Sequence, residues 1–253
     1  MARYELLNNV AHKDLRVITG FGPGAGNAAG TVPAFPTEFA ELQREYPIFF
    51  HKDATSGDYS AVALLGFDRH ENLYLQNGRW NAAYLPGYVA KGPFLIGFQE
   101  QWVDGEARRE PVIHVDLDHP AVSFSEGEAV FLPGGGHTPY LQHISTILRG
   151  IRDGVEGGKA FYAALAAHDL IQPMSVEVRF DAEHGANLTG LHGIDRERLA
   201  ALDAAALHAL HQQGFLEGIY LVLASMYNMR RLIAEKQHRL REETGAAASA
   251  RAG

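Results

Sequence analysis

Short apolar runs separated by turn residues fill the first half of the chain. The runs lie at residues 15–19, 48–50, 59–65, 73–75, 94–98 and 112–117. They are rich in β-branched and aromatic residues, and turn signals such as Asn77-Gly78 and Asp104-Gly105 separate them, which is typical of strands joined by short connections. We therefore predict a mixed, mainly antiparallel sheet in the N-terminal half, up to about residue 132.

The spacing of apolar residues becomes helical after Gly134-Gly135-Gly136. Apolar residues between Leu141 and Ile151 recur every three or four positions, which predicts a helix that ends at Asp153-Gly154. Further helices are predicted at residues 158–170, from Asp195, from Asp203 to Gly214 and from Phe215 to about Glu243, with a hairpin at residues 174–180 and 187–194. The fold class is therefore α+β, with the sheet of the N-terminal half packed with a helix-rich C-terminal half.

The long terminal helix carries an apolar stripe formed by Ile219, Val222, Leu223 and Met226, and we expect this stripe to be buried. The 253 residues are 46% hydrophobic and 21% charged, which is enough apolar material for a large core. No internal repeat or linker interrupts the pattern. Residues 1–243 are therefore predicted to form one domain and residues 244–253 a flexible tail.

Composition narrows the classes of function. A formal net charge of −8 disfavours nucleic-acid binding, which requires a clustered basic surface. The absence of cysteine excludes disulfides, thiolate metal sites and a cysteine nucleophile. The N-terminus has no apolar stretch typical of a secretory signal, and no apolar run reaches the ~20 residues of a membrane span, so a cytoplasmic location is expected.

A glycine-rich loop follows the first predicted strand. Gly24-x-Gly26-x-x-Ala29 superficially matches the dinucleotide-binding fingerprint. That fingerprint requires a helix after its second glycine, and Gly30, Pro33 and Pro36 interrupt the segment that follows. We therefore interpret it as a loop and expect no bound organic cofactor.

His114 and Asp116 are the candidate metal ligands. If residues 112–117 form a strand, both side chains lie on one face, where an imidazole and a carboxylate supply two corners of a two-histidine, one-carboxylate iron site. The sequence does not select the third ligand among His137, His184 and His192. The alternative is a strand with a solvated polar face that ends in a turn at Pro120.

Seven segments together resemble the SapC family of bacterial proteins, which is named after a gene linked to a surface-layer system. They are residues 7–16, 32–39, 43–48, 63–68, 79–80, 92–94 and 224–232, which read LNNVAHKDLR, VPAFPTEF, QREYPI, ALLGFD, RW, GPF and ASMYNMRRL. The resemblance implies no agreed activity or set of catalytic residues. It implies association with outer-membrane receptors, halogenase-like enzymes and cupin-like hydroxylases.

Two hypotheses follow. The first is an accessory protein that binds a partner protein in a surface-layer or outer-membrane uptake or modification system, with Arg44, Tyr46, Trp80 and Arg230 as structural or partner-facing residues. Large aromatic residues and arginine suit both packing and interface roles. The second is an enzyme that depends on iron or another divalent metal held by His114 and Asp116.

Overall fold

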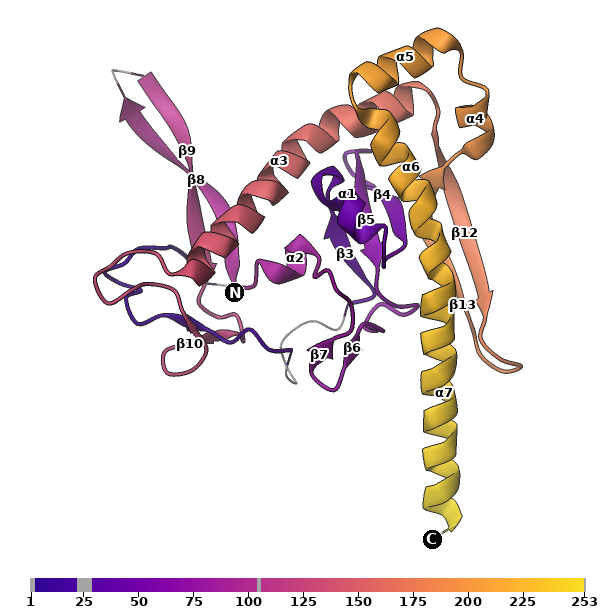
Figure 1. The fold of residues 1–253 in the computed structure, drawn as a ribbon, viewed down its shortest axis with the longest axis horizontal. Coiled ribbons are helices and arrows are strands. Elements are labelled where there is room, and N and C mark those ends of the chain that lie inside the picture. Colours follow the sequence, from indigo (N-terminus) through magenta and orange to yellow (C-terminus); the bar gives the residue numbers. More distant parts are fainter. Residues whose placement is uncertain (1–2, 22–28, 104–105, 253) are drawn as a thin grey trace. The chain divides into compact units, whose positions relative to one another are not determined.

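The computed structural model describes residues 3–21, 29–103 and 106–252 (Figure 1). The glycine motif at residues 24–29 lies almost entirely outside the described residues. Helices and antiparallel sheets are both present, which confirms the α+β class. Contacts divide the chain into two compact units. Unit 1 comprises Met1–Asn27, Asn77–Trp80 and Leu85–Asp153, and unit 2 comprises Ala28–Gln76, Asn81–Tyr84 and Gly154–Gly253.

Unit 1 contains two small antiparallel sheets. Its elements are β1 (Tyr4–Leu6), β2 (Arg16–Val17), β7 (Arg79–Trp80), α2 (Gly87–Ala90), β8 (Phe94–Val103), β9 (Glu106–Asp116), β10 (Val122–Ser123), β11 (Glu128–Ala129) and the first half of α3 (Pro139–Ala167). The strand orders are β1-β9-β8 and β10-β2-β11. Val17 of β2, Phe94 of β8 and Val115 of β9 form one hydrophobic core with Leu141 and Ile144 of α3.

Unit 2 is built on a five-stranded antiparallel sheet of order β12-β13-β4-β5-β3. Its elements are β3 (Thr31–Ala34), η1 (Pro36–Glu38), α1 (Phe39–Leu42), β4 (Ile48–Lys52), β5 (Tyr59–Leu64), β6 (Leu75–Gln76), β12 (Ile171–Arg179), β13 (Gly185–Ile194), α4 (Arg196–Ala200), α5 (Ala204–Gln212), α6 (Phe215–Ser225), η2 (Met226–Asn228) and α7 (Met229–Ala252). The predicted late hairpin is confirmed as β12 and β13. It also extends the sheet, because Leu191 and His192 pair with His51 and Phe50 of β4.

Two predicted helix starts have the expected caps. The Asp195 carboxylate accepts hydrogen bonds from the backbone N–H groups of Glu197 and Arg198, and Asp203 accepts one from Ala206. Aspartate is favoured at this position because its oxygen satisfies an N–H group that has no partner within the helix. The sequence therefore locates α4 and α5 correctly at their N-terminal ends.

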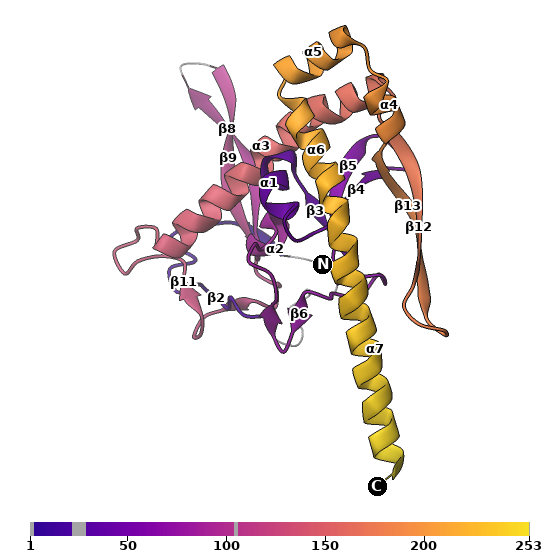
Figure 2. The ribbon, with the colours of Figure 1, turned by 45° about the vertical axis from the view of Figure 1, so that its right-hand side comes forward.

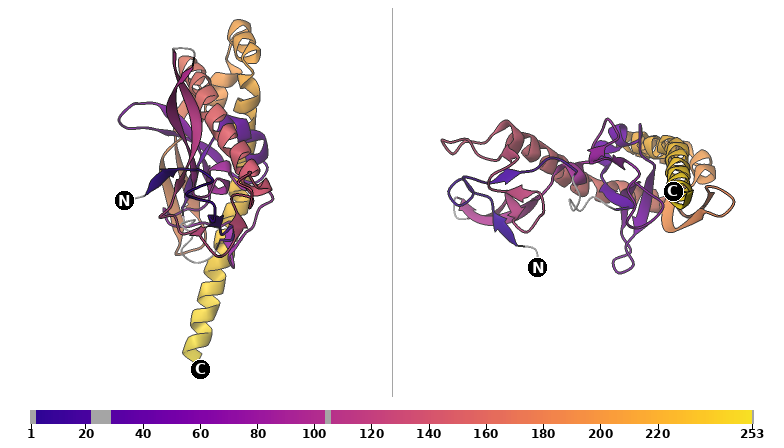
Figure 3. Two further views of the ribbon diagram at one scale, coloured as in Figure 1. Left: turned by 90° about the vertical axis from the view of Figure 1, so that its left-hand side faces the viewer. Right: turned by 90° about the horizontal axis from the view of Figure 1, so that it is seen from below.

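The predicted terminal helix is divided into α6, η2 and α7, which continue one another in Figure 2. Burial of its apolar stripe is confirmed, since Ile219 and Val222 are buried and Leu223 and Met226 are partly buried. In the view from below, α7 is seen nearly end-on as a straight helix (Figure 3). It continues to Ala252, whereas the sequence predicts a tail from residue 244. The prediction of a single domain over residues 1–243 stays a prediction.

One continuous helix, α3, replaces the two helices predicted on either side of Asp153-Gly154. Gly154 is buried, and a Cβ atom added there would lie 2.6 Å from Phe35 Cβ and 2.7 Å from Thr37 Oγ1. These distances leave no room for a side chain. The glycine is therefore required by the close approach of residues 35–37, and it does not mark the end of a helix.

We expect Gly154→Ala to lower the free energy of unfolding by about 1–3 kcal/mol, because overpacking outweighs the better helix propensity of alanine. Gly157 is the matched control, since nothing lies within 4 Å of a Cβ atom built there. Gly157→Ala should raise the free energy of unfolding by up to about 1 kcal/mol. Urea denaturation of both variants measures the difference, and equal effects at the two positions would contradict the proposed close approach.

Candidate functional site

Residues 43–48 connect α1 to β4 in unit 2, and side chains distant in sequence hold them. Pro47 prevents the helix from continuing, so the carbonyl groups of the segment need partners outside it. Asn228 Nδ2 donates to the carbonyl oxygen atoms of Gln43 and Tyr46 at 2.8 and 3.2 Å. We call residues 43–48 and the side chains that bind them from residues 225–231 the 43–48 joint.

Ser225 completes the β4 end of the joint. Its side chain is fully buried, its Oγ accepts a hydrogen bond from Ile48 N at 2.9 Å, and its hydroxyl donates to Val222 O at 2.6 Å. The hydroxyl is thus satisfied as donor and acceptor, as a buried polar group requires. The start of β4 is thereby tied to the last turn of α6.

The Glu45 carboxylate is the charged centre of the joint. It accepts hydrogen bonds from the backbone N–H groups of Ala83 and Tyr84 at 3.1 and 2.9 Å, and Arg231 Nη1 lies 3.2 Å away. Burial raises the pKa of Glu45, but the two amides and the guanidinium outweigh burial, so its pKa lies below the ordinary value. Glu45 is therefore an ionised anchor at neutral pH.

Three tyrosines surround this anchor as hydrogen-bond donors. The hydroxyl of Tyr74 donates to Glu45 O, that of Tyr46 donates to Tyr84 O, and that of Tyr84 donates to Glu38 Oε2. Burial is the largest cause that raises the pKa of Tyr74 and of Tyr84. The hydroxyls of Tyr74 and Tyr84 therefore stay protonated, so they suit fixed hydrogen bonding and are unsuited to act as bases.

A cavity of about 300 Å³ lies beside Arg231. It is lined by Leu73, Tyr74, Asn81, Arg231, Leu232, Ala234, Glu235 and His238. The Arg231 guanidinium lies 5.5 Å from the centre of the Tyr74 ring, and its Nη2 donates to Asn81 O at 2.8 Å. Arginine is thus held by a carboxylate, a carbonyl group and an aromatic face, which fixes this wall of the cavity.

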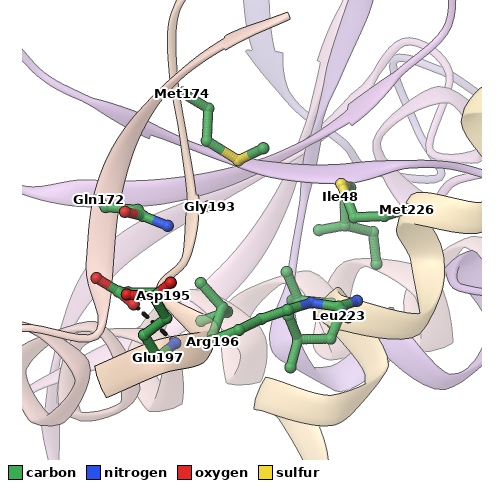
Figure 4. Close-up of a pocket in the computed structure, with 11 residues that line it drawn as sticks. Ile48, Gln172, Met174, Gly193, Asp195, Arg196, Glu197, Leu223 and Met226 are labelled. Atoms are coloured by element: carbon green, nitrogen blue, oxygen red, sulfur yellow. Dashed lines mark hydrogen bonds between the residues drawn. The ribbon is translucent and has the colours of Figure 1, made fainter. Parts of the chain in front are cut away.

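A second cavity of about 370 Å³ lies on the other side of the Ser225 contact, between the sheet and α6 (Figure 4). Ile48, Leu223 and Met226 lie on one side of it, and Met174 lies on the other. Its remaining lining residues are Gln172, Gly193, Ile194, Asp195, Arg196, Glu197 and Val222. We call it the methionine cavity. Met174 lies across Gly193, where no side chain has room.

Large side chains are exposed next to the methionine cavity. Tyr220 is 57% exposed and Tyr227 is 69% exposed, and Leu223 lies between them at helical spacing. Arg230 is exposed and makes no ion pair with any of the described residues. We call Tyr220, Leu223, Met226, Tyr227 and Arg230 the α6 face.

The predicted interaction residues have different surroundings. Tyr46 is fully buried, which agrees with the structural one of the two roles expected for it and leaves it no surface for a partner. Arg44 is exposed and paired with Glu41 at 3.1 Å, and Trp80 is half-buried with its ring centre 5.3 Å from that of Phe21. Arg230 alone of the four belongs to the α6 face.

The predicted metal ligands share one face of β9 in unit 1, where His114 pairs with Leu6 and Asp116 with Tyr4. His114 Nδ1 is buried without a hydrogen-bond partner among the described residues, and its ring lies against Gly97. Within the same described part, no group of three histidine, aspartate or glutamate residues is placed to hold a metal. The third ligand is therefore not located, and the metal site stays a prediction.

Asp116 has two basic side chains, those of Lys91 and His119, as neighbours. Burial lowers the pKa of Lys91, and the negative charge of Asp116 opposes this effect. Burial and the positive charge of Lys91 both lower the pKa of His119, whereas the negative charge of Asp116 raises it. The carboxylate of Asp116 thus has two basic neighbours that the sequence pattern did not indicate.

Sequence reasoning missed the 43–48 joint. Glu45 and Arg231 lie within the segments that carry the family resemblance. In the sequence alone, however, nothing distinguishes either of them from an ordinary charged surface residue. One signal was available. Pro47 ends a helix and leaves carbonyl groups near Tyr46 that need hydrogen-bond donors, and Asn228 is a donor within another segment that carries the resemblance. The methionine cavity had no sequence signal, because six separate elements line it.

These features define an α+β protein that exposes two tyrosines and an arginine along the consecutive helical segments α6, η2 and α7, beside a cavity lined by both polar and apolar side chains. The SapC family model matches residues 7–232, and the chain belongs to the SapC family. Comparisons with curated proteins and with solved structures gave no match. None of the helices in the described part of the chain has the length and apolar character that a membrane span requires.

We expect Glu45→Gln to lower the free energy of unfolding at pH 7 by about 1–3 kcal/mol, because charge-assisted hydrogen bonds to two amides are weakened. The folded-state pKa is depressed, so the stabilisation is present above the ordinary value of 4.5 and is lost as pH falls through the folded pKa. Urea denaturation between pH 3 and 7 should show a smaller pH dependence in the variant. Glu41→Gln, which removes an exposed pair, should change stability by less than about 0.5 kcal/mol.

Proposed function

We propose that this protein is an accessory protein that binds a partner protein through the α6 face and the methionine cavity. The observation that carries the proposal is the composition of this surface. Tyrosine and arginine dominate the binding energy of protein interfaces, and two strongly exposed tyrosines and one arginine without an ion pair in the described chain occur together here.

The methionine cavity supports the same proposal. Met174, Leu223 and Met226 line it with flexible or branched apolar side chains, and methionine adapts its shape to different apolar groups. In Figure 4 the side chain of Arg196 extends towards Leu223 along the wall of the cavity. Such a cavity suits one apolar side chain of a partner, with an acidic group of that partner near Arg196.

The 43–48 joint holds this surface in place. Ser225 lies between Leu223 and Tyr227 in sequence, and its hydrogen bonds tie that turn to β4. A surface whose backbone is fixed loses little conformational entropy on binding, which favours affinity. The joint is therefore a positioning device for the α6 face in this proposal.

The wider role follows from the family resemblance. We propose that the partner belongs to a surface-layer or outer-membrane uptake or modification system, and that halogenase-like or cupin-like enzymes are candidate partners. The acidic chain, with its net charge of −8, favours a protein partner over a nucleic acid. A cytoplasmic location is part of the same proposal.

We expect Tyr227→Ala to weaken binding of the natural partner about 30-fold, which corresponds to about 2 kcal/mol at an interface hot spot. The partner is identified by mass spectrometry after purification of the tagged full-length chain from its own cells. The affinity of the purified pair is then measured by calorimetry. Tyr88→Ala, at another exposed tyrosine, should leave the dissociation constant within about twofold.

Urea denaturation must show that both tyrosine variants retain the stability of the original chain. A purified partner whose affinity is unchanged by Tyr227→Ala and by Leu223→Asp would contradict binding through the α6 face. The absence of any stoichiometric partner would contradict the accessory function itself.

One observation favours the metal-dependent enzyme as a second candidate, namely the unpaired buried Nδ1 atom of His114. Under that hypothesis, protein purified without an affinity tag should contain stoichiometric iron or another divalent metal. Both His114→Ala and Asp116→Ala should then lose it, because each removes a ligand. Elemental analysis of the unsubstituted chain and of the two variants tests this hypothesis. Metal that persists in both variants would exclude these residues as ligands.

A further inference from the structure

Strands β8 and β9 of unit 1 form a long ribbon that has little support from other strands. They pair from Phe94 with Val115 to Val103 with Glu106. The third strand of this sheet, β1, pairs only with residues 114–116 of β9. Most of the ribbon is therefore two-stranded, and two-stranded hairpins are marginally stable in water.

The two outer edges of the ribbon differ. β9 is covered by β1 at its base, and Pro111 lacks the N–H group that an added strand would use. β8 has β9 as its only strand partner among the described residues, and Glu100 is its single charged residue over ten positions. Charge, lysine and proline are the usual protection of an edge strand, and β8 has almost none of it.

One large apolar side chain of β8, that of Phe98, is exposed where the ribbon leaves the core. Phe94 is buried and Ile96 packs against the core of unit 1, whereas Phe98 is 50% exposed on the same strand face as Ile96. The guanidinium of Arg109 in β9 lies 5.0 Å from the centre of the Phe98 ring. Phe98 thus presents an aromatic surface near the middle of an open edge.

We propose that β8 is a self-association edge, at which the β8 strands of two copies of this chain pair antiparallel about a twofold axis at Phe98. This pairing places the two Phe98 side chains opposite each other, and aromatic pairs stabilise neighbouring strands. It places each Glu100 opposite Ile96 of the other copy, so the only charges on the strand stay about 13 Å apart, four residues along the strand. The two ribbons become one four-stranded sheet, and twofold symmetry is the commonest form of homo-oligomer.

The proposal is independent of the α6 face, and its test uses the oligomeric state of the full-length chain. Analytical ultracentrifugation between 1 and 100 µM should show a dimer that dissociates on dilution. Phe98→Asp places two carboxylates opposite each other and should raise the dissociation constant at least tenfold. Phe124→Asp is the matched control, because Phe124 is a 63% exposed phenylalanine of the same unit outside the ribbon, and it should leave the dimer unchanged.

A second measurement uses the absence of cysteine in the natural chain. Phe98→Cys should form an intermolecular disulfide under mild oxidation, and Phe124→Cys should not, because only position 98 meets its own copy. A chain that is monomeric at 100 µM overturns the proposal. A dimer that survives Phe98→Asp, or disulfide formation at equal rates in the two cysteine variants, also overturns it.

Discussion

The arrangement of unit 2 depends on hydrogen bonds to the backbone groups that follow α1. Proline at position 47 ends the helical path, so the carbonyl groups of Gln43 and Tyr46 and the N–H group of Ile48 find their partners in side chains distant in sequence. Each such group, if left unpaired, costs about 1–3 kcal/mol. Ser225 and Asn228 supply the missing partners, and Arg231 adds an ion pair to Glu45. Polar bonds thus set the position of the C-terminal helices, in addition to the buried stripe at Ile219 and Val222.

The same helices divide their side chains between two roles. Ile219 and Val222 are buried within unit 2, whereas Tyr220 and Tyr227 are exposed. Leu223 and Met226 are partly buried and also line the methionine cavity. The same helical segment therefore contributes to the core and to the exposed surface, and Leu223 and Met226 belong to both.

Local signals predicted the local features of the fold. The caps at Asp195 and Asp203 and the late hairpin follow from short-range patterns, and the structure confirms them. The continuity of α3 was not predictable, because Gly154 is explained by contact with Phe35, which lies far away in sequence. For the same reason the sequence left open whether Tyr46 is structural or faces a partner, since its burial depends on partners such as Tyr84. The methionine cavity forms only when six elements assemble, and no linear pattern records that.

The order in which the two units use the chain affects how the protein folds during synthesis. Unit 1 is complete once residue 153 has been made, whereas unit 2 begins at residue 28 and needs the last hundred residues. Strand β4 must therefore wait for β13, whereas all the residues of unit 1 have been made by then. β5 ends at Leu64 and β13 at Ile194, so 130 residues separate them. Synthesis extends the chain by about 5–20 residues per second, so this wait lasts roughly 6–26 s. Neither unit corresponds to a continuous stretch of the gene, and a simple truncation cannot release one of them intact.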